Sequence, residues 1–167
     1  MLHVRLATPY DAPAIATLAL EVQDWHVTGR PDIFKLGACD TAPEIVARIG
    51  TDDQFYWVAI DDEAIVGYAY ARVVDEPENR WKYASRVMVL DQMGVARHSR
   101  RHGAGSRLWE AVRSLATEKR ADRVVLNVWA FNASARAFYE RVGFRPMHER
   151  MAVELASSPT ANGHPTR

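Results

Sequence analysis

Two spacings of apolar positions run along this chain, and each predicts its own kind of element. Alternation, or a short β-branched and aromatic run, predicts a strand, whereas spacing of three or four residues predicts an amphipathic helix. The predicted strands cover residues 2–6, 55–60, 64–74, 83–95, 123–129 and 144–155. The predicted helices begin near residues 8, 41, 105 and 132. This order, β-α-α-β-β-β-α-β-α-β, predicts an α/β (α+β) fold with a mixed sheet flanked by helices.

Capping residues set the expected helix ends. Residues 8–11 and 41–44 each combine a threonine with an acid three residues later and an intervening proline, which is capping-box chemistry. Pro13 leaves open a start a few residues later for the first helix. Glycines at 29, 50 and 143 mark the expected ends, with Gly143 as a left-handed cap.

The segment between the fourth strand and the third helix carries the strongest chemical signal. Residues 97–107 are rich in arginine and histidine, contain Gly103 and Gly105, and have no acid. N–H groups at a helix start carry partial positive charge, and glycines let a ligand approach the backbone closely. The pattern predicts a phosphate-bearing ligand at residues 100–106. No lysine follows Gly105, so the loop does not match a nucleotide-binding P-loop.

Composition indicates the number of domains, the class of partner and the compartment. The chain has 167 residues, 48% hydrophobic and 25% charged, which suits one domain over residues 1–155 with a flexible tail at 156–167. Lys+Arg and Asp+Glu number 21 each, which argues against a nucleic-acid partner. Cys39 has no second cysteine to pair with, and neither a signal peptide nor a bilayer-spanning stretch is visible. We therefore expect a cytoplasmic protein without a membrane partner.

Two spaced motifs resemble those of the GNAT superfamily, the acetyl-CoA-dependent N-acetyltransferases. Residues 100–105, Arg-Arg-His-Gly-Ala-Gly, resemble the R/Q-x-x-G-x-G/A loop. Asn132, Tyr139, Gly143 and Phe144 resemble the second motif, N-x(6)-Y-x-x-x-G-F. The hairpin at residues 58–69 is also similar, although its turn lacks the usual glycine. The resemblance spans residues 2–155 and implies a mostly antiparallel, twisted sheet.

The resemblance implies acetyl-CoA as the co-substrate. Its pyrophosphate would lie on the basic loop, and the amides of its pantetheine arm would pair with the edge of the fourth strand as an added strand would. Gly94 on that strand predicts a bulge or a close backbone approach. Asn132 would contact the arm, cap its helix, or do both. The residues assigned to the co-substrate are Met93, Gly94, Val95, Arg100, Arg101, His102, Gly103, Ala104, Gly105, Ser106 and Asn132.

Acetyl transfer to an amine moves two protons, so the chain needs an acid and a base. Tyr139 is the candidate acid, because a phenol with a pKa of ~10 is protonated at neutral pH and can donate to the thiolate. Asp91 is the candidate base, acting through water. An aspartate in an apolar strand is costly unless paired, so a structural partner such as an arginine is the equal alternative. Glu76 and Tyr83 are weaker candidates for substrate or proton contacts.

The acceptor pocket is expected from the first helix, the loop after it and the hairpin. Its aromatic and polar candidates are Trp25, His26, Arg30, Phe34, Tyr68 and Tyr70. Acids at its mouth would favour a polyamine, whereas Arg30 would favour an acceptor with a carboxylate. His98 and His102 lie in a loop without a cysteine, so no metal is expected.

The resulting hypothesis is an N-acetyltransferase that transfers acetyl to a primary amine of a small molecule or peptide in a ternary complex. The alternative is a non-catalytic acyl-CoA-binding or sensing module. The acceptor amine, the use of other acyl groups and the oligomeric state stay open, with a homodimer suggested by the superfamily.

Overall fold

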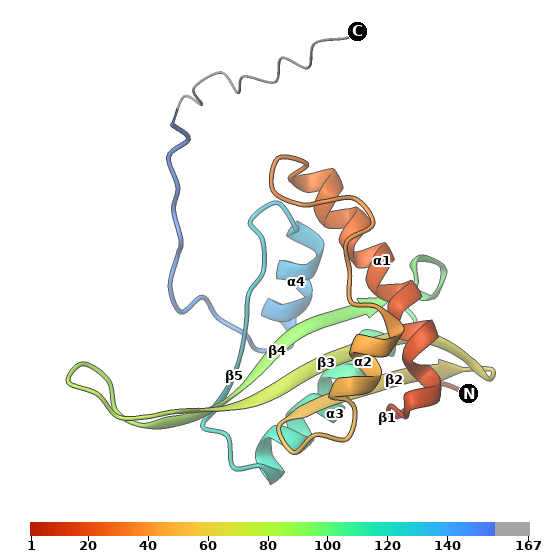
Figure 1. Ribbon diagram of the computed structural model, residues 1–167, viewed down its shortest axis with the longest axis horizontal. Helices are drawn as coiled ribbons and strands as arrows, with labels where there is room; N and C mark the ends of the chain where they lie inside the picture. The colour runs from red at the N-terminus through yellow and green to blue at the C-terminus, as the bar shows by residue number, and fades with distance from the viewer. Residues whose placement is uncertain (156–167) are drawn as a thin grey trace, which may run out of the picture.

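A single twisted sheet organises the molecule (Figure 1). The computed structural model describes residues 1–155, so the expected tail at 156–167 lies outside the described residues. The sheet order is β1-β2-β3-β4-β5, and all neighbours are antiparallel except β4 and β5, which are parallel. The strands are β1 (His3–Leu6), β2 (Gln54–Asp61), β3 (Ala64–Glu76), β4 (Ser85–Val95) and β5 (Arg123–Leu126). The predicted mixed, mostly antiparallel sheet is confirmed.

Helices cover both faces of the sheet. In Figure 1, α1 (Ala12–Gly29) and α2 (Ala42–Arg48) lie on one face, and α3 (Ala104–Glu118) lies on the other. α4 (Ala133–Arg141) lies beside the start of α3, where Phe138 packs against Gly105. Two short 3-10 segments, Pro9–Asp11 and Arg97–Ser99, precede α1 and α3.

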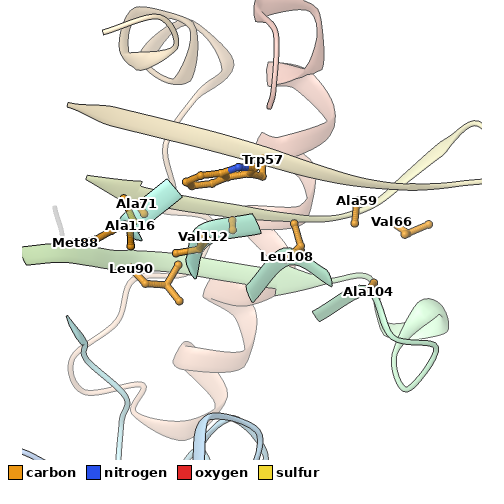
Figure 2. Packing of buried hydrophobic residues seen from close by; sticks show 11 residues of the cluster. Trp57, Ala59, Val66, Ala71, Met88, Leu90, Ala104, Leu108, Val112 and Ala116 are labelled. Carbon is orange, nitrogen blue, oxygen red and sulfur yellow. The ribbon is translucent and has the colours of Figure 1, made fainter. Parts of the chain in front are cut away.

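The α3 face is packed with apolar side chains (Figure 2). Leu108 and Val112 of α3 are fully buried and lie against Trp57, Met88 and Leu90 of the sheet. Small residues in the same cluster let the helix approach the strands closely. This packing fixes the position of α3, and therefore the loop in front of it, relative to β4.

The α1–α2 face has a different composition. Tyr56, Tyr68 and Tyr70 are buried there beside Ile15 of α1 and Ile45 of α2. The rings of Tyr56 and Tyr70 stack with their centroids 4.3 Å apart. Each buried hydroxyl needs a hydrogen-bond partner, so this face carries polar side chains among its apolar ones.

The capping chemistry read from the sequence is present in the structure. Asp11 accepts hydrogen bonds from the Thr8 N–H (2.6 Å) and hydroxyl (2.9 Å), but the box opens a 3-10 turn, and α1 itself starts at Ala12. Thr41 and Glu44 form the second box at α2. Gly143 has φ +107°, as a left-handed cap requires.

The hairpin turn without glycine is accommodated by its own backbone. Asp62 and Glu63 both adopt positive φ, 45° and 67°. Two such residues in succession match the right-handed twist of the strands that they join. The predicted antiparallel pairing of β2 and β3 is confirmed.

The expected last strand is not formed. Residues 144–155 are extended but carry no strand pairing, and β5 ends at Leu126 rather than at residue 129. Met151, Val153 and Leu155 are 88%, 81% and 82% exposed. Alternation makes a segment suitable for a strand, but a strand forms only where a sheet edge pairs with it.

The bulge also lies elsewhere than at Gly94. Tyr70 pairs with Gln92 and Ala71 pairs with Leu90, so Asp91 is the extra residue in β4. Gly94 serves the other predicted purpose, close approach, because a Cβ there would lie 2.7 Å from Val22 of α1.

Candidate active site

β4 has an open edge where it separates from β5. Pairing between the two strands runs only from Val87 with Arg123 to Leu90 with Leu126. Beyond it, β4 continues to Val95 and pairs only with β3 among the described residues. The backbone of Met93, Gly94 and Val95 therefore lies on an edge that can accept an extended partner.

The basic loop leads from this edge to the start of α3. Arg101 and Gly103 have positive φ, 67° and 90°, which turns the chain into the helix. Gly103 is the N-cap residue and provides no side-chain capping hydrogen bond, so the first N–H groups of α3 stay available. Arg100 donates from Nε to the Val95 carbonyl at 3.1 Å, which ties the loop to the open edge.

The predicted co-substrate residues of the loop lie together at this helix start. Arg100, Arg101, His102, Gly103 and Ser106 are exposed. Ala104 is buried at 2% exposure, so only its backbone can face a ligand. An anion at this position would meet both the backbone dipoles and the arginines.

Asp91 lies at the bulge of β4 and is ion-paired. Its Oδ2 accepts a hydrogen bond from Arg72 Nε at 2.7 Å, and the Asp91 side chain is 27% exposed. The carboxylate raises the pKa of the Arg72 guanidinium, chiefly through this hydrogen bond. The structural partner weighed for Asp91 is therefore present. The exposed part of the carboxylate remains accessible to water.

Tyr139 lies on α4 and packs against the apolar cluster of the α3 face. Its ring meets those of Phe138 and Phe144 edge-on, at 5.4 and 5.5 Å between centroids. Burial raises the pKa of Tyr139 to about 12, so the phenol keeps its proton at neutral pH.

Asn132 caps the helix that carries Tyr139. Its Oδ1 accepts from the Ala135 N–H at 3.2 Å and from the Ser134 hydroxyl at 3.1 Å. The capping role is thus present, and it leaves the side-chain amide nitrogen for a further contact.

The acceptor candidates divide into a buried pair and a surface group. Tyr68 is 0% exposed and Tyr70 8% exposed, so both line the core rather than an open pocket. His26 stacks on Phe34 with centroids 4.9 Å apart, and burial lowers the pKa of His26, which favours its neutral form. Trp25 is 41% exposed.

Arg30 is held by acidic partners. Its NH2 nitrogen lies 2.6 Å from Asp32 and 3.4 Å from Glu154 of the C-terminal segment. The guanidinium is therefore already balanced by carboxylates. Glu76 and Tyr83 lie on the hairpin that projects from the sheet in Figure 1, where Glu76 accepts from the Ser85 hydroxyl.

Sequence reasoning missed two aromatic residues between β5 and α4. The Trp129 and Phe34 rings meet edge-on at 5.1 Å, and Phe131 lies 6.3 Å from His26. A Cβ on Gly29 would lie 2.2 Å from the Phe131 ring, so these two positions are in tight contact. The only sequence signal was two aromatics inside the second motif, and core residues give the same signal.

Within residues 1–155, no three His, Cys, Asp or Glu side chains are arranged to hold a metal ion. No helix in that range is long and apolar enough to cross a membrane.

The arrangement of an open β4 edge, an uncapped helix start and the second motif agrees with a family comparison. The profile of the Acetyltransferase (GNAT) family matches residues 19–144. The chain belongs to the GNAT acetyltransferase family. The described part of the site also suits coenzyme A, because strand-edge groups can pair with its amides and the helix start with its phosphates.

The chain is also similar to several individual proteins. Human "N-acetyltransferase 8" is 31% identical over 90 residues, which are 54% of this chain and 38% of that protein. The tetramutant of BH1408 protein from Bacillus halodurans has a TM-score of 0.85 at 26% identity, over 91% of this chain and 99% of its own. Aminoglycoside N-acetyltransferase AAC(6')-Iy, solved with CoA, shares the fold with a TM-score of 0.69 at 16% identity, over 94% and 96%.

Proposed function

We propose that this chain transfers the acetyl group of acetyl-CoA to a primary amine of a small molecule or peptide, in a ternary complex. The observation that carries the proposal is the open edge of β4, which ends at the uncapped start of α3. Few ligands other than coenzyme A join amides that suit a strand edge to phosphates that suit a helix start.

The backbone of residues 93–95 holds the pantetheine amides in this proposal. The N–H groups of residues 104–106, with Arg100 and Arg101, bind the pyrophosphate. Acetyl-CoA supplies the thioester when bound. An N–H of the β4 edge donates to the thioester oxygen, where negative charge grows during attack by the amine.

Two side chains move the protons. Asp91 accepts the proton that the acceptor ammonium must lose, through a water molecule at its exposed side. Arg72 holds the Asp91 carboxylate in place through the ion pair at 2.7 Å. Tyr139 donates to the departing thiolate, because its pKa of about 12 keeps it protonated throughout the working range.

The test is thiol release from acetyl-CoA against amino acids, polyamines, aminoglycosides and peptides. With an accepted amine, we expect Tyr139→Phe to lower kcat by about 10- to 100-fold and to leave the Kd of acetyl-CoA unchanged. Tyr83→Phe is the control, since Tyr83 is 89% exposed on the projecting hairpin.

The possible outcomes separate the alternatives. Unchanged turnover in Tyr139→Phe would remove Tyr139 from the acid role. Tight coenzyme A binding without thiol release for any amine would instead identify a non-catalytic acyl-CoA-binding module.

A further inference from the structure

Two tyrosines on one face of β3 each donate a hydrogen bond to a glutamine on a neighbouring strand. The Tyr68 hydroxyl donates to Gln92 Oε1 on β4 at 3.0 Å. The Tyr70 hydroxyl donates to Gln54 Oε1 on β2 at 2.7 Å. The two pairs have the same chemistry, but only the first reaches the strand with the open edge.

The Tyr68 bond determines which way the Gln92 amide points. Tyr68 is fully buried, and Gln92 is the hydrogen-bond partner of its hydroxyl among the described residues. Losing that bond would leave a buried hydroxyl unsatisfied, which is unfavourable. In the structure Gln92 presents Oε1 to Tyr68, and its Nε2 points away from that hydroxyl.

The bulge brings this donor next to the proposed base. Because Asp91 is the extra residue, Asp91 and Gln92 reach the same face, where they contact Arg72 and Tyr68 of β3. Gln92 is half-buried, and among residues 1–155 no acceptor is bound to its Nε2. The donor thus lies one residue from Asp91, on a side chain that is only half-buried.

Three arginines on this side of the sheet are ion-paired. Asp91 pairs with Arg72, Arg30 with Asp32, and Arg48 with Asp40 at 2.5 Å. A second ammonium or a carboxylate on the acceptor would find each of these opposite charges engaged. The Nε2 of Gln92 is a neutral donor beside these pairs.

We propose that Gln92 selects acceptors that carry an oxygen, hydroxyl or carbonyl, beside the reactive amine, and that Tyr68 is its positioning residue. The substrate class is hydroxylated or carbonyl-bearing amines, as opposed to plain polyamines. This inference rests on the proposed acetyl transfer for its acceptor role, whereas the orientation of Gln92 by Tyr68 does not depend on it.

The kinetic test compares ethanolamine and glycinamide with propylamine and putrescine. The wild type is expected to favour the two oxygen-bearing amines by about 10-fold in kcat/KM, the value of one hydrogen bond. Gln92→Leu removes that preference. Tyr68→Phe weakens it through a higher acceptor KM while the KM of acetyl-CoA is unchanged. Tyr70→Phe, the matched control, keeps the preference.

A second measurement tests whether Tyr68 holds the Gln92 side chain in place. Side-chain 15N relaxation of the NH2 group reports whether Gln92 is held. We expect a rigid Gln92 in the wild type and in Tyr70→Phe, and a mobile one in Tyr68→Phe. Thermal unfolding of each variant shows that the fold is retained.

The possible results test the acceptor role, the positioning role and the proposed function separately. A preference for putrescine, or an unchanged preference in Gln92→Leu, overturns the acceptor role. A Gln92 equally mobile in the wild type and Tyr68→Phe overturns the positioning role. Absence of transfer to every amine by the folded wild type overturns the proposed function, and the relaxation data still decide the positioning role.

Discussion

The two faces of the sheet bury different kinds of side chain. The α3 face consists of apolar side chains that interdigitate, with Leu108 and Val112 at its centre (Figure 2). The α1–α2 face buries Tyr56, Tyr68 and Tyr70, and each ring adds a hydroxyl that needs a partner. Apolar contacts are non-directional, whereas hydrogen bonds fix orientation. We therefore expect the first face to contribute most to stability and the second to hold its polar side chains in fixed orientations.

The largest loss of stability is expected from a substitution at the centre of the α3 face. Leu108 is 0% exposed, so Leu108→Ala leaves a cavity and is expected to lower the free energy of unfolding by about 3 kcal/mol. Urea denaturation measures the loss. Leu36→Ala, at a residue 78% exposed, is the control and should change stability by less than about 0.5 kcal/mol. Equal effects of the two changes would contradict the assigned core.

The next largest effect is expected in activity, on the opposite face. Asp91→Asn keeps the shape but removes the base, so turnover with an accepted amine should fall about 100-fold. Asp75→Asn is the matched control, because Asp75 pairs with Arg86 at 2.6 Å across the same two strands, on the projecting hairpin. A variant Asp91→Asn that is destabilised yet fully active would show that the aspartate is only an ion-pair partner.

A substitution at Asp11 tests whether hydrogen-bonded polar groups on the α1–α2 side also contribute to the free energy of unfolding. It accepts from Arg5 at 2.7 and 2.9 Å and from Thr8, and the Arg5 hydrogen bond is the main cause that lowers its pKa to about 2. Asp11→Asn should therefore cost about 1.5 kcal/mol at pH 7. Glu44→Gln, in the second capping box without an arginine, should cost less.

The sign of the pH dependence follows from the depressed pKa of Asp11. Its contribution is fully present above the unfolded pKa of about 3.9 and is lost as pH falls through about 2. The stability difference between the wild type and Asp11→Asn should thus shrink from pH 5 to pH 2. A difference that stays constant over this range in urea denaturation would contradict the assigned ion pair.

The smallest effect is expected in the segment that belongs to neither face. Leu155 is 82% exposed, and Leu155→Ser should change the free energy of unfolding by less than about 0.5 kcal/mol. A loss above about 1 kcal/mol in chemical denaturation would show that the Leu155 side chain packs against the domain in solution.

The elements with local causes were predictable. Capping boxes at Thr8 and Thr41, the β2–β3 hairpin and the left-handed Gly143 follow from residues within a few positions of each other. The basic loop was predictable for the same reason, since a strand, two glycines and a helix start are consecutive in the chain. These features need no distant contact to form.

Features that depend on a distant partner were predicted less well. The alternation at residues 144–155 suits a strand, but the described structure pairs it with no edge. The register between β3 and β4 puts the bulge at Asp91, where no glycine marks it. Trp129 and Phe131 contact the candidate acceptor residues Phe34 and His26 only because α1 and the loop after it fold against them.

The sequence by itself carried the two spaced motifs that resemble the GNAT family, and it predicted the helix caps and the β2–β3 hairpin from neighbouring residues. The roles of the basic loop and of Tyr139 stay predictions. Tertiary packing alone decided that buried Tyr68 donates a hydrogen bond to Gln92 and that Asp91 is paired with Arg72. It also decided that pairing between β4 and β5 stops at Leu90, which leaves the rest of the β4 edge open. Burial, strand register and ion pairing join residues far apart in sequence, so only the folded chain specifies them.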